Sequence, residues 1–275
     1  MKHTARSFIR RHPLSLQEVI TTPLIFREYV PGFEALPFPG SAVIRDLAAF
    51  AGHSPGAVRT AMSRLRAAGE LVSFVDPSGV TRFRLTETQK SVGGVVRDWP
   101  ARPEGFLIGV FSFRAPEEAK RRAVRETLLH FGFKRIAQNT YINGMIDTSV
   151  LDAEMKRAGV ADRFYVFHCP QIDDPALLRR LAGVFDVKGR KHALEGYREE
   201  LAAFLEEPGI DGIELGRRVF YAGPVHHRTC FVEEPPIPAR ILPQGYPLSE
   251  LWSYLDSIIT ARRGDIMRYY RTLCG

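Results

Sequence analysis

One short stretch, SPGAVRTAMSRLRAAG from Ser54 to Gly69, constrains the fold most because it marks both ends of a helix. Ser54 is a favourable N-cap residue, and Pro55 suits the first helical turn, where its missing N–H costs nothing. Gly69 suits the left-handed residue that follows the last turn. The stretch therefore predicts a helix over about residues 55–68.

This helix has one apolar and one polar face. Its apolar residues recur at steps of three and four, and they are Val58, Ala61, Met62, Leu65 and Ala68. The opposite face carries Arg59, Thr60, Ser63 and Arg64. Just upstream, SAVIRDLAAFAG over residues 41–52 predicts a second amphipathic helix that ends in glycine. Two short helices joined this closely have the spacing of a helix-turn-helix.

A β-hairpin is predicted immediately after the two helices. The runs LVSFV and VTRFRL are separated by Asp-Pro-Ser-Gly at residues 76–79, which favours a turn. Arg82 and Arg84 alternate with two apolar residues, so we expect both arginines on the solvent face of the hairpin. Thr86 and Gln89 form a capping-box pair that would start another helix. Helix, turn, helix and hairpin in this order predict a winged helix-turn-helix.

Such a unit points to double-stranded DNA as a partner. The major groove admits one α-helix, and arginine can bind guanine O6 and N7 together. The net charge of +7 also favours a polyanionic partner, and the excess of positive charge lies in residues 1–190. The alternative is that the arginines are only the solvent-exposed face of an amphipathic helix. The order helix, turn, helix and hairpin argues against this alternative. The predicted DNA-binding residues are Ser54, Arg59, Thr60, Ser63, Arg64, Arg82 and Arg84.

The middle of the chain alternates strand-like and helix-like segments. After WPAR at residues 99–102, which we interpret as a linker, FLIGVFSF predicts a buried strand at residues 106–113. A helix over 116–131, a strand-like run over 133–144, a helix over 150–158 and the strand RFYVFHC follow. This order predicts a small ferredoxin-like α/β sandwich, with room for a hairpin in the second run.

Enzymatic alternatives are less well supported. CRISPR adaptation endonucleases have a similar fold and need a carboxylate near the end of the first strand to hold a metal. Here no Asp or Glu precedes Glu117 in that region, and Asp174, which precedes a proline, is better explained as an N-cap. A CoA-ester hydrolase would call for a nucleophile motif such as GxSxG, which is missing. We therefore expect no enzyme, with these two classes and a non-DNA interaction module as the alternatives.

Four motifs, in their order along the chain, carry a resemblance to a known family. They are VRTAMSRLRAAGELV at residues 58–72, AGVADRFYVFHC at 158–169, FDV at 185–187 and PPIPARILPQGYPLSELWSYL at 235–255. Together they make the whole chain resemble the PaaX family of transcriptional repressors, the phenylacetate-degradation regulator family. The resemblance implies a winged-helix DNA binder with a ferredoxin-like middle domain and a helical C-terminal domain. It further implies a repressor of a catabolic operon, acting in phenylacetate catabolism or a related pathway, that an aryl-CoA thioester such as phenylacetyl-CoA releases from DNA.

The effector is expected to bind the C-terminal third. No GxGxxG or other glycine-rich phosphate loop occurs there, so scattered arginines and aromatic residues would have to bind an aryl-CoA, and no cofactor is expected. His226, His227 and Cys230 include metal-ligand types, but a structural zinc site needs four ligands, so no metal is assigned. The predicted effector-binding residues are Arg217, Arg218, Tyr221, His226, His227, Trp252, Arg262 and Arg263.

The sequence also leads to expectations about the cellular compartment, the domain division and the oligomeric state. The sequence has no signal-peptide-like or membrane-spanning apolar run, and its three cysteines are well separated, so we expect a cytoplasmic protein. We expect a winged helix-turn-helix domain over residues 1–98, a middle domain over 99–172 and a helical effector-sensing domain over 173–275. A homodimer is expected because one short helix reads only a few base pairs.

Overall fold

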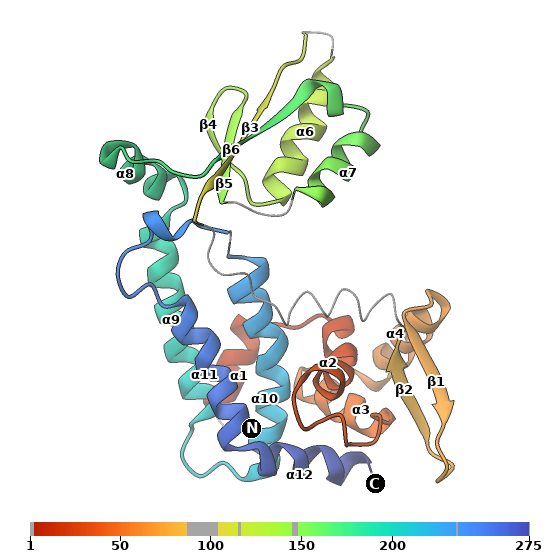
Figure 1. Ribbon diagram of the computed structural model, residues 1–275. Helices are drawn as coiled ribbons and strands as arrows, with labels where there is room; N and C mark the ends of the chain where they lie inside the picture. Colours follow the sequence, from red (N-terminus) through yellow and green to blue (C-terminus); the bar gives the residue numbers. More distant parts are fainter. Residues whose placement is uncertain (1–2, 87–103, 115–116, 145–147, 235, 275) are drawn as a thin grey trace. The chain divides into compact units, whose positions relative to one another are not determined.

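The computed structural model of the protein describes residues 3–86, 104–114, 117–144, 148–234 and 236–274 (Figure 1). These residues form many helices and two small antiparallel sheets, which agrees with the expected mixed α+β class. Within these ranges, no helix has both the length and the apolar character needed to cross a membrane. The expected linker at residues 99–102 and Gln89 of the expected capping box lie outside the described residues.

The chain divides into two compact units that do not coincide with three consecutive domains. Unit 1 comprises Met1–Trp99, Glu195–Cys230 and Leu248–Gly275, and unit 2 comprises Pro100–Leu194 and Phe231–Pro247. The expected boundary near residue 98 lies outside the described residues, and the C-terminal third is shared between both units. The reason is that helices distant in sequence pack on the N-terminal helices to complete one core.

Unit 1 is built mainly from helices. Two of its helices, α10 and α12, pack closely on one another, and both also contact α3. The close approach of α10 and α12 needs a small residue, because a Cβ added at Gly216 would lie only 2.4 Å from Cβ of Tyr269. The helices are α1 (His3–Arg11), α2 (Leu16–Tyr29), α3 (Ser41–Phe50), α4 (Pro55–Ala67), α10 (Gly212–His227), α11 (Leu248–Ala261) and α12 (Arg263–Cys274). Helix α9 (Val187–Leu205) begins in unit 2 and ends in unit 1.

The hairpin of unit 1 consists of β1 (Leu71–Val75) and β2 (Thr81–Leu85), paired antiparallel with Leu71 opposite Leu85. Its turn is organised by Asp76, whose carboxylate accepts hydrogen bonds from the backbone N–H of Ser78 and Val80 at 2.9 and 3.0 Å. Hydrogen bonds from the Ser78 hydroxyl and from Arg82 lower the pKa of Asp76. Gly79 completes the turn at φ +82°.

The expectation that Arg82 faces solvent is wrong. Its side chain is only 4% exposed; Nε donates to Asp76 at 2.7 Å, and an Nη donates to the carbonyl of Cys274 at 2.8 Å. The expectation came from the alternation of arginines and apolar residues along the strand, and it assumes that one face of a two-stranded ribbon is open to water. Here the end of α12 lies against that face. Arg84 is exposed, as expected.

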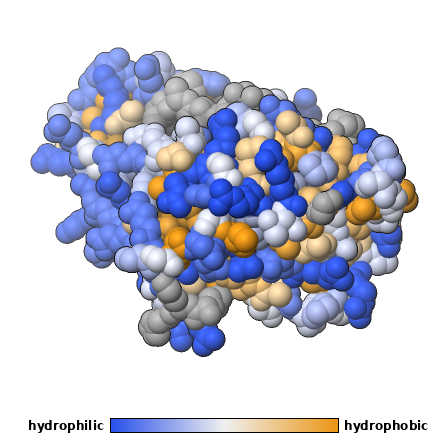
Figure 2. All heavy atoms as spheres, turned by 90° about the horizontal axis from the view of Figure 1, so that it is seen from below, coloured by the Kyte–Doolittle hydropathy of each residue, from blue (hydrophilic) through white to orange (hydrophobic). Residues whose placement is uncertain are grey.

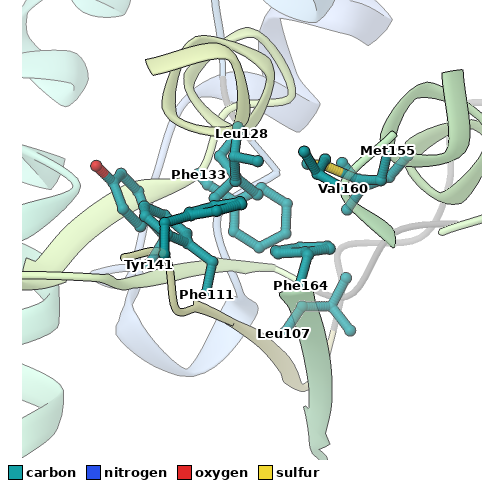
Figure 3. Packing of buried hydrophobic residues seen from close by; sticks show 11 residues of the cluster. Leu107, Phe111, Leu128, Phe133, Tyr141, Met155, Val160 and Phe164 are labelled. Atoms are coloured by element: carbon teal, nitrogen blue, oxygen red, sulfur yellow. The ribbon is translucent and has the colours of Figure 1, made fainter. Parts of the chain in front are cut away.

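Unit 2 contains a four-stranded antiparallel sheet in the order β4-β5-β3-β6. Its elements follow one another as β3 (Phe106–Phe111), α6 (Glu118–His130), β4 (Lys134–Ala137), β5 (Thr140–Gly144), α7 (Ser149–Arg157) and β6 (Phe164–Cys169). The expected strand-like run over 133–144 is therefore a hairpin of two strands. Buried residues from the sheet and from α6 and α7 form the core, including Leu107, Phe111, Leu128, Met155 and Phe164 (Figure 3).

The rest of unit 2, in the part of the chain that the structure describes, includes helix α8 (Pro175–Val184), the first part of α9 and short helical turns. Asp174 caps α8, as expected, by accepting a hydrogen bond from the backbone N–H of Ala176 at 2.8 Å. Phe185 and Asp186 join α8 to α9, and Asp186 adopts the left-handed conformation at φ 50°. Its carboxylate also accepts from the N–H of Gly189 at 3.3 Å. A short polar side chain tolerates this backbone conformation better than a bulky one does.

Candidate nucleic-acid interface

Helix α4 has the boundaries and the orientation that its sequence predicts. The Ser54 hydroxyl accepts a hydrogen bond from the backbone N–H of Ala57 at 3.2 Å, and Gly69 follows the helix at φ +71°. Val58, Met62 and Leu65 are buried, and α4 packs on α2, α3 and β1. Because this apolar stripe is fixed in the core, the opposite face of α4 must point away from it.

The opposite face of α4 is polar, positively charged and exposed. Arg59, Thr60, Ser63 and Arg64 are all exposed, as is the N-cap Ser54. The Thr60 hydroxyl donates to the carbonyl of Gly56 at 3.2 Å, and this bond leaves both acceptor lone pairs of its oxygen unused. Within the described part of the chain, neither Arg59 nor Arg64 forms an ion pair. Their charge is therefore not neutralised by a carboxylate of the described residues.

Other cations lie on the elements that adjoin α4. Arg66 on α4 itself and Arg45 on α3 are exposed. On the hairpin, Arg84 is exposed and its guanidinium carbon lies 5.9 Å from the centre of the Phe74 ring. Cations spaced over a helix and a hairpin in this way could contact several phosphates of one nucleic acid. Sequence reasoning missed Arg45 and Arg66, although the exposed position of both follows from the same helical periodicity.

Helix α3, on which α4 packs, is tied to the C-terminal helices by a carboxylate. Asp46 accepts hydrogen bonds from Arg217 at 2.8 and 3.1 Å and from the Tyr269 hydroxyl at 2.8 Å. Asp46 is the single acidic residue of α3. Its negative charge is thus directed toward α10 and α12 and is compensated there.

The two predicted effector-binding arginines of α10 are engaged in internal ion pairs. Arg217 pairs with Asp46 and, at 2.7 Å, with Glu214. Arg218 is 1% exposed and pairs with Glu207 at 2.7 Å and Glu214 at 3.0 Å. It also donates to the carbonyl of Phe204 at 2.8 Å. Arg217 thus connects α10 to α3, and Arg218 connects α10 to the end of α9. The contact between Arg217 and Asp46 could not be foreseen because the two residues are distant in sequence.

Three further predicted effector residues, Tyr221, His226 and Trp252, lie on α10 and α11. The ring of His226 stacks on that of Trp252, with centroids 5.9 Å apart and planes inclined by 23°. His226 is buried, and its Nδ1 lies 3.3 Å from the Tyr197 hydroxyl. Burial, and to a smaller extent the charge of His227, lower the pKa of His226 to about 4. The Tyr221 hydroxyl donates to the carbonyl of His12 at 2.8 Å, and burial raises the pKa of Tyr221 to about 12.

The remaining predicted effector residues are Arg262, Arg263 and His227. Arg262 pairs with Asp265 at 3.0 Å. Arg263 lies beside Gly32, where a Cβ would be 3.2 Å from one of its Nη atoms. His227 is half-buried, and burial lowers its pKa. In the part of the chain described here, no three His, Cys, Asp or Glu side chains gather as a metal site.

A cavity that sequence reasoning did not find lies in unit 2. Its volume is about 510 Å³. Three cations, Lys188, Lys191 and Arg240, line it together with apolar residues of α8 and of the segment after residue 240. Arg240 also pairs with Asp173 at 3.0 Å. None of the predicted effector residues lines this cavity.

The surface seen from below the view of Figure 1 carries no single dominant character. Figure 2 shows hydrophilic residues over its left part, with hydrophilic and hydrophobic residues mixed over the centre and right.

Comparison with known proteins finds a similar fold among solved structures. No family model matches the sequence, and no curated protein matches it. Among solved structures, the chain is similar to the uncharacterized protein Rv0674 from Mycobacterium tuberculosis, with 19% identity and a TM-score of 0.59. The similarity covers 93% of this chain and 99% of that one. The two proteins therefore share a fold over nearly their full lengths.

Proposed function

We propose that this protein is a transcription regulator that binds double-stranded DNA through α4. The observation that carries the proposal is the exposed face of α4, where Arg59 and Arg64 have no carboxylate partner among the described residues. An unpaired arginine on an exposed helix face is free to bind guanine in the major groove or a phosphate beside it.

The surrounding elements support a winged helix-turn-helix. Helices α3 and α4 meet through a short turn, and the hairpin β1–β2 follows α4 directly. In this arrangement α4 enters the major groove, and Arg84 on the hairpin contacts the backbone phosphates. Arg82 is assigned no DNA contact, because its side chain is buried against Asp76 and α12.

The resemblance to the PaaX family extends the proposal to the rest of the chain. The order of strands and helices from β3 to β6, with sheet order β4-β5-β3-β6, is consistent with a ferredoxin-like middle unit. On this basis the protein represses a catabolic operon and acts as a homodimer. An aryl-CoA such as phenylacetyl-CoA would release it from DNA.

The experiment that tests DNA binding is fluorescence anisotropy of a labelled duplex taken from the region upstream of the protein's own gene. A scrambled duplex of the same length and composition is the control, and both are titrated at two salt concentrations. Tighter binding to the upstream duplex at both salt concentrations supports the proposal. Equal affinity for the two duplexes at both concentrations would contradict a sequence-reading regulator.

Adding phenylacetyl-CoA to the same titration tests the effector separately. Weaker binding to the upstream duplex, with free CoA as the control without effect, supports release by an aryl-CoA. If phenylacetyl-CoA leaves the affinity unchanged, this part of the proposal is wrong, whereas DNA binding stands. Arg217 and Arg218 already form ion pairs with carboxylates of the protein. An effector that binds these two arginines would therefore have to break those ion pairs.

A further inference from the structure

The cavity of unit 2 lies between the end of α8, the start of α9 and a segment that begins at the short helical turn Ala239–Ile241. Helix α8 packs on that turn. All of the residues that line the cavity belong to unit 2. Its volume of about 510 Å³ falls within the range of sites that hold small organic ligands.

The two walls of the cavity are connected through Arg190 in the first turn of α9. Its Nε donates to the carbonyl of Phe185 at 3.1 Å, and an Nη donates to the carbonyl of Glu233 at 3.0 Å. The same Nη pairs with the buried carboxylate of Glu234 at 3.3 Å. These bonds join the α8–α9 junction to the chain that precedes the opposite wall, so the walls are held together without a ligand.

Part of the lining is apolar. Val187 and Ile241 are 4% and 7% exposed, and Leu242 is half-buried. Val187 belongs to α9, whereas the other two belong to the opposite wall. Transfer of hydrocarbon from water to such a surface is favourable, so this part of the cavity suits the apolar part of a ligand.

Three cations line the same cavity. Lys188 and Lys191 are three residues apart on α9, so they occupy neighbouring positions on its surface and can reach one group. Lys188 is exposed and forms no ion pair within the described residues. Arg240 lies on the opposite wall and donates to the carbonyl of Ile172 at 3.1 Å and to Asp173 at 3.0 Å. Both bonds involve Nη1, so neither engages the N–H groups of Nε or Nη2.

The carboxylate among the described lining residues, that of Asp186, is directed to the first turn of α9. It accepts a hydrogen bond from the N–H of Gly189 at 3.3 Å, and a Cβ added at Gly189 would lie 2.5 Å from one of its oxygens. Burial and, to a smaller extent, the charge of Arg190 lower the pKa of Lys134, whose charge also interacts with Asp186. Positive charge is therefore in excess around the cavity.

We propose that this cavity binds a small organic phosphate. The phosphate group accepts hydrogen bonds from Lys188, Lys191 and Arg240, and the apolar part of the ligand packs on Val187 and Ile241. A phosphate monoester has a charge of about −2 at neutral pH and three terminal oxygens. It therefore matches three cationic donors that exceed the one lining carboxylate by two charges, and the planar fork of arginine suits a phosphate.

The proposal is independent of DNA binding and of the aryl-CoA effector, because none of the predicted effector residues lines the cavity. Isothermal titration calorimetry of the DNA-free full-length protein with phenyl phosphate tests it. We expect saturable binding with a Kd below about 1 mM. Inorganic phosphate lacks the apolar part and phenol lacks the phosphate, so each should bind at least about tenfold more weakly.

Two substitutions test the role of charge. Lys188→Gln and Lys191→Gln each remove one charge-assisted hydrogen bond and should weaken binding of phenyl phosphate about tenfold. The matched control is Lys156→Gln, which removes the same charge from an exposed position of α7 in the same unit and should leave the affinity unchanged.

A third variant tests the cavity without changing charge. Gly183 on α8 lines the cavity, and a Cβ added there would meet no described atom within 4 Å, so Gly183→Trp should fold and obstruct the ligand. Its control is Gly196→Trp on α9, where an added Cβ is equally free and which does not line the cavity. Melting curves by circular dichroism verify that the variants fold.

Three results would overturn the proposal. One is the absence of binding at about 5 mM phenyl phosphate. The second is binding of inorganic phosphate as tight as that of phenyl phosphate, which would indicate a general anion site. The third is binding of phenyl phosphate that the Lys188, Lys191 and Gly183 variants all leave unchanged, which would place the ligand elsewhere.

Discussion

The arginines of α4 and those of α10 show how one residue type serves two different purposes in unit 1. Arg59 and Arg64 on α4 are exposed and form no ion pair within the described residues. Arg217 and Arg218 on α10 are half-buried and buried, and three carboxylates neutralise them. The first pair can bind an external polyanion, whereas the second stabilises the protein.

The difference between the two pairs depends on contacts that are distant in sequence. Arg217 meets Asp46, which lies 171 residues earlier, and Arg218 meets Glu207 and the carbonyl of Phe204 on the preceding helix. Helical periodicity identifies the exposed face of an isolated helix, but it does not reveal which other helix will cover that face. The contrast between the two pairs of arginines can be tested by substitution and by changing the pH.

Arg218→Ala should lower the free energy of unfolding by about 3–5 kcal/mol. The substitution leaves the carboxylates of Glu207 and Glu214 partly buried without their counter-ion, and removing one partner of a buried ion pair is strongly destabilising. Urea denaturation followed by circular dichroism measures the change. The control is Arg122→Ala, whose pair with Glu126 is exposed and should contribute about 0–1 kcal/mol. Similar losses of unfolding free energy for the two variants would contradict the structural role assigned to Arg218.

Acidification should destabilise the protein through His226. The pKa of His226 is about 4 in the folded protein, against 6.5 for a histidine in the unfolded chain, so the unfolded chain binds an extra proton between these values. The free energy of unfolding should therefore fall as the pH decreases from 6.5 to 4, by about 3 kcal/mol from this residue.

The comparison of wild type with His226→Gln isolates this contribution from other titrating groups. The variant lacks the titrating ring, so its stability should change less over the same pH window. Denaturation curves at several pH values give the two profiles. Parallel profiles would show that His226 is not responsible for the loss.

Arg59→Ala should weaken binding to the upstream duplex by about 1–3 kcal/mol and relax base specificity at the contacted position, while stability stays unchanged. This outcome would distinguish Arg59 from Arg218, whose loss should mainly affect folding. Fluorescence anisotropy with duplexes substituted at single base pairs measures both effects. An equal loss on scrambled DNA would mean that Arg59 contacts phosphate alone.

Arg84→Ala should have the smallest effect, a uniform weakening across DNA sequences. If Arg84 contacts one phosphate, the slope of log affinity against log salt concentration should decrease in magnitude by about one. Titrations at a series of salt concentrations give the slope. An unchanged slope would remove the hairpin β1–β2 from the DNA interface.

Local sequence signals predicted the capped helix of the candidate interface, the hairpin turn that follows it and one N-cap of unit 2. The capped helix α4, the turn at Asp76 and the N-cap Asp174 depend on residues within a few positions of each other, and all three are present in the structure. The exposed positions of Arg59, Arg64 and Arg84 likewise follow from local periodicity.

Features that depend on distant packing were not predictable in the same way. The burial of Arg82 requires the end of α12, and the division into two units requires helices from the C-terminal third to complete the N-terminal core. The cavity beside Lys188 depends on a segment more than fifty residues later. No local pattern in the sequence indicates such contacts, because they arise only when the chain is folded.

The most direct test of the central claim is the affinity of the double variant Arg59→Ala/Arg64→Ala for the upstream duplex. Arg122→Ala/Arg180→Ala, which removes the same charge from exposed positions of unit 2, is the matched control. Our account predicts that the α4 variant loses its preference for the upstream duplex over the scrambled one, whereas the control keeps it. Equal affinities of the two variants, with the preference retained in both, would contradict DNA recognition by α4.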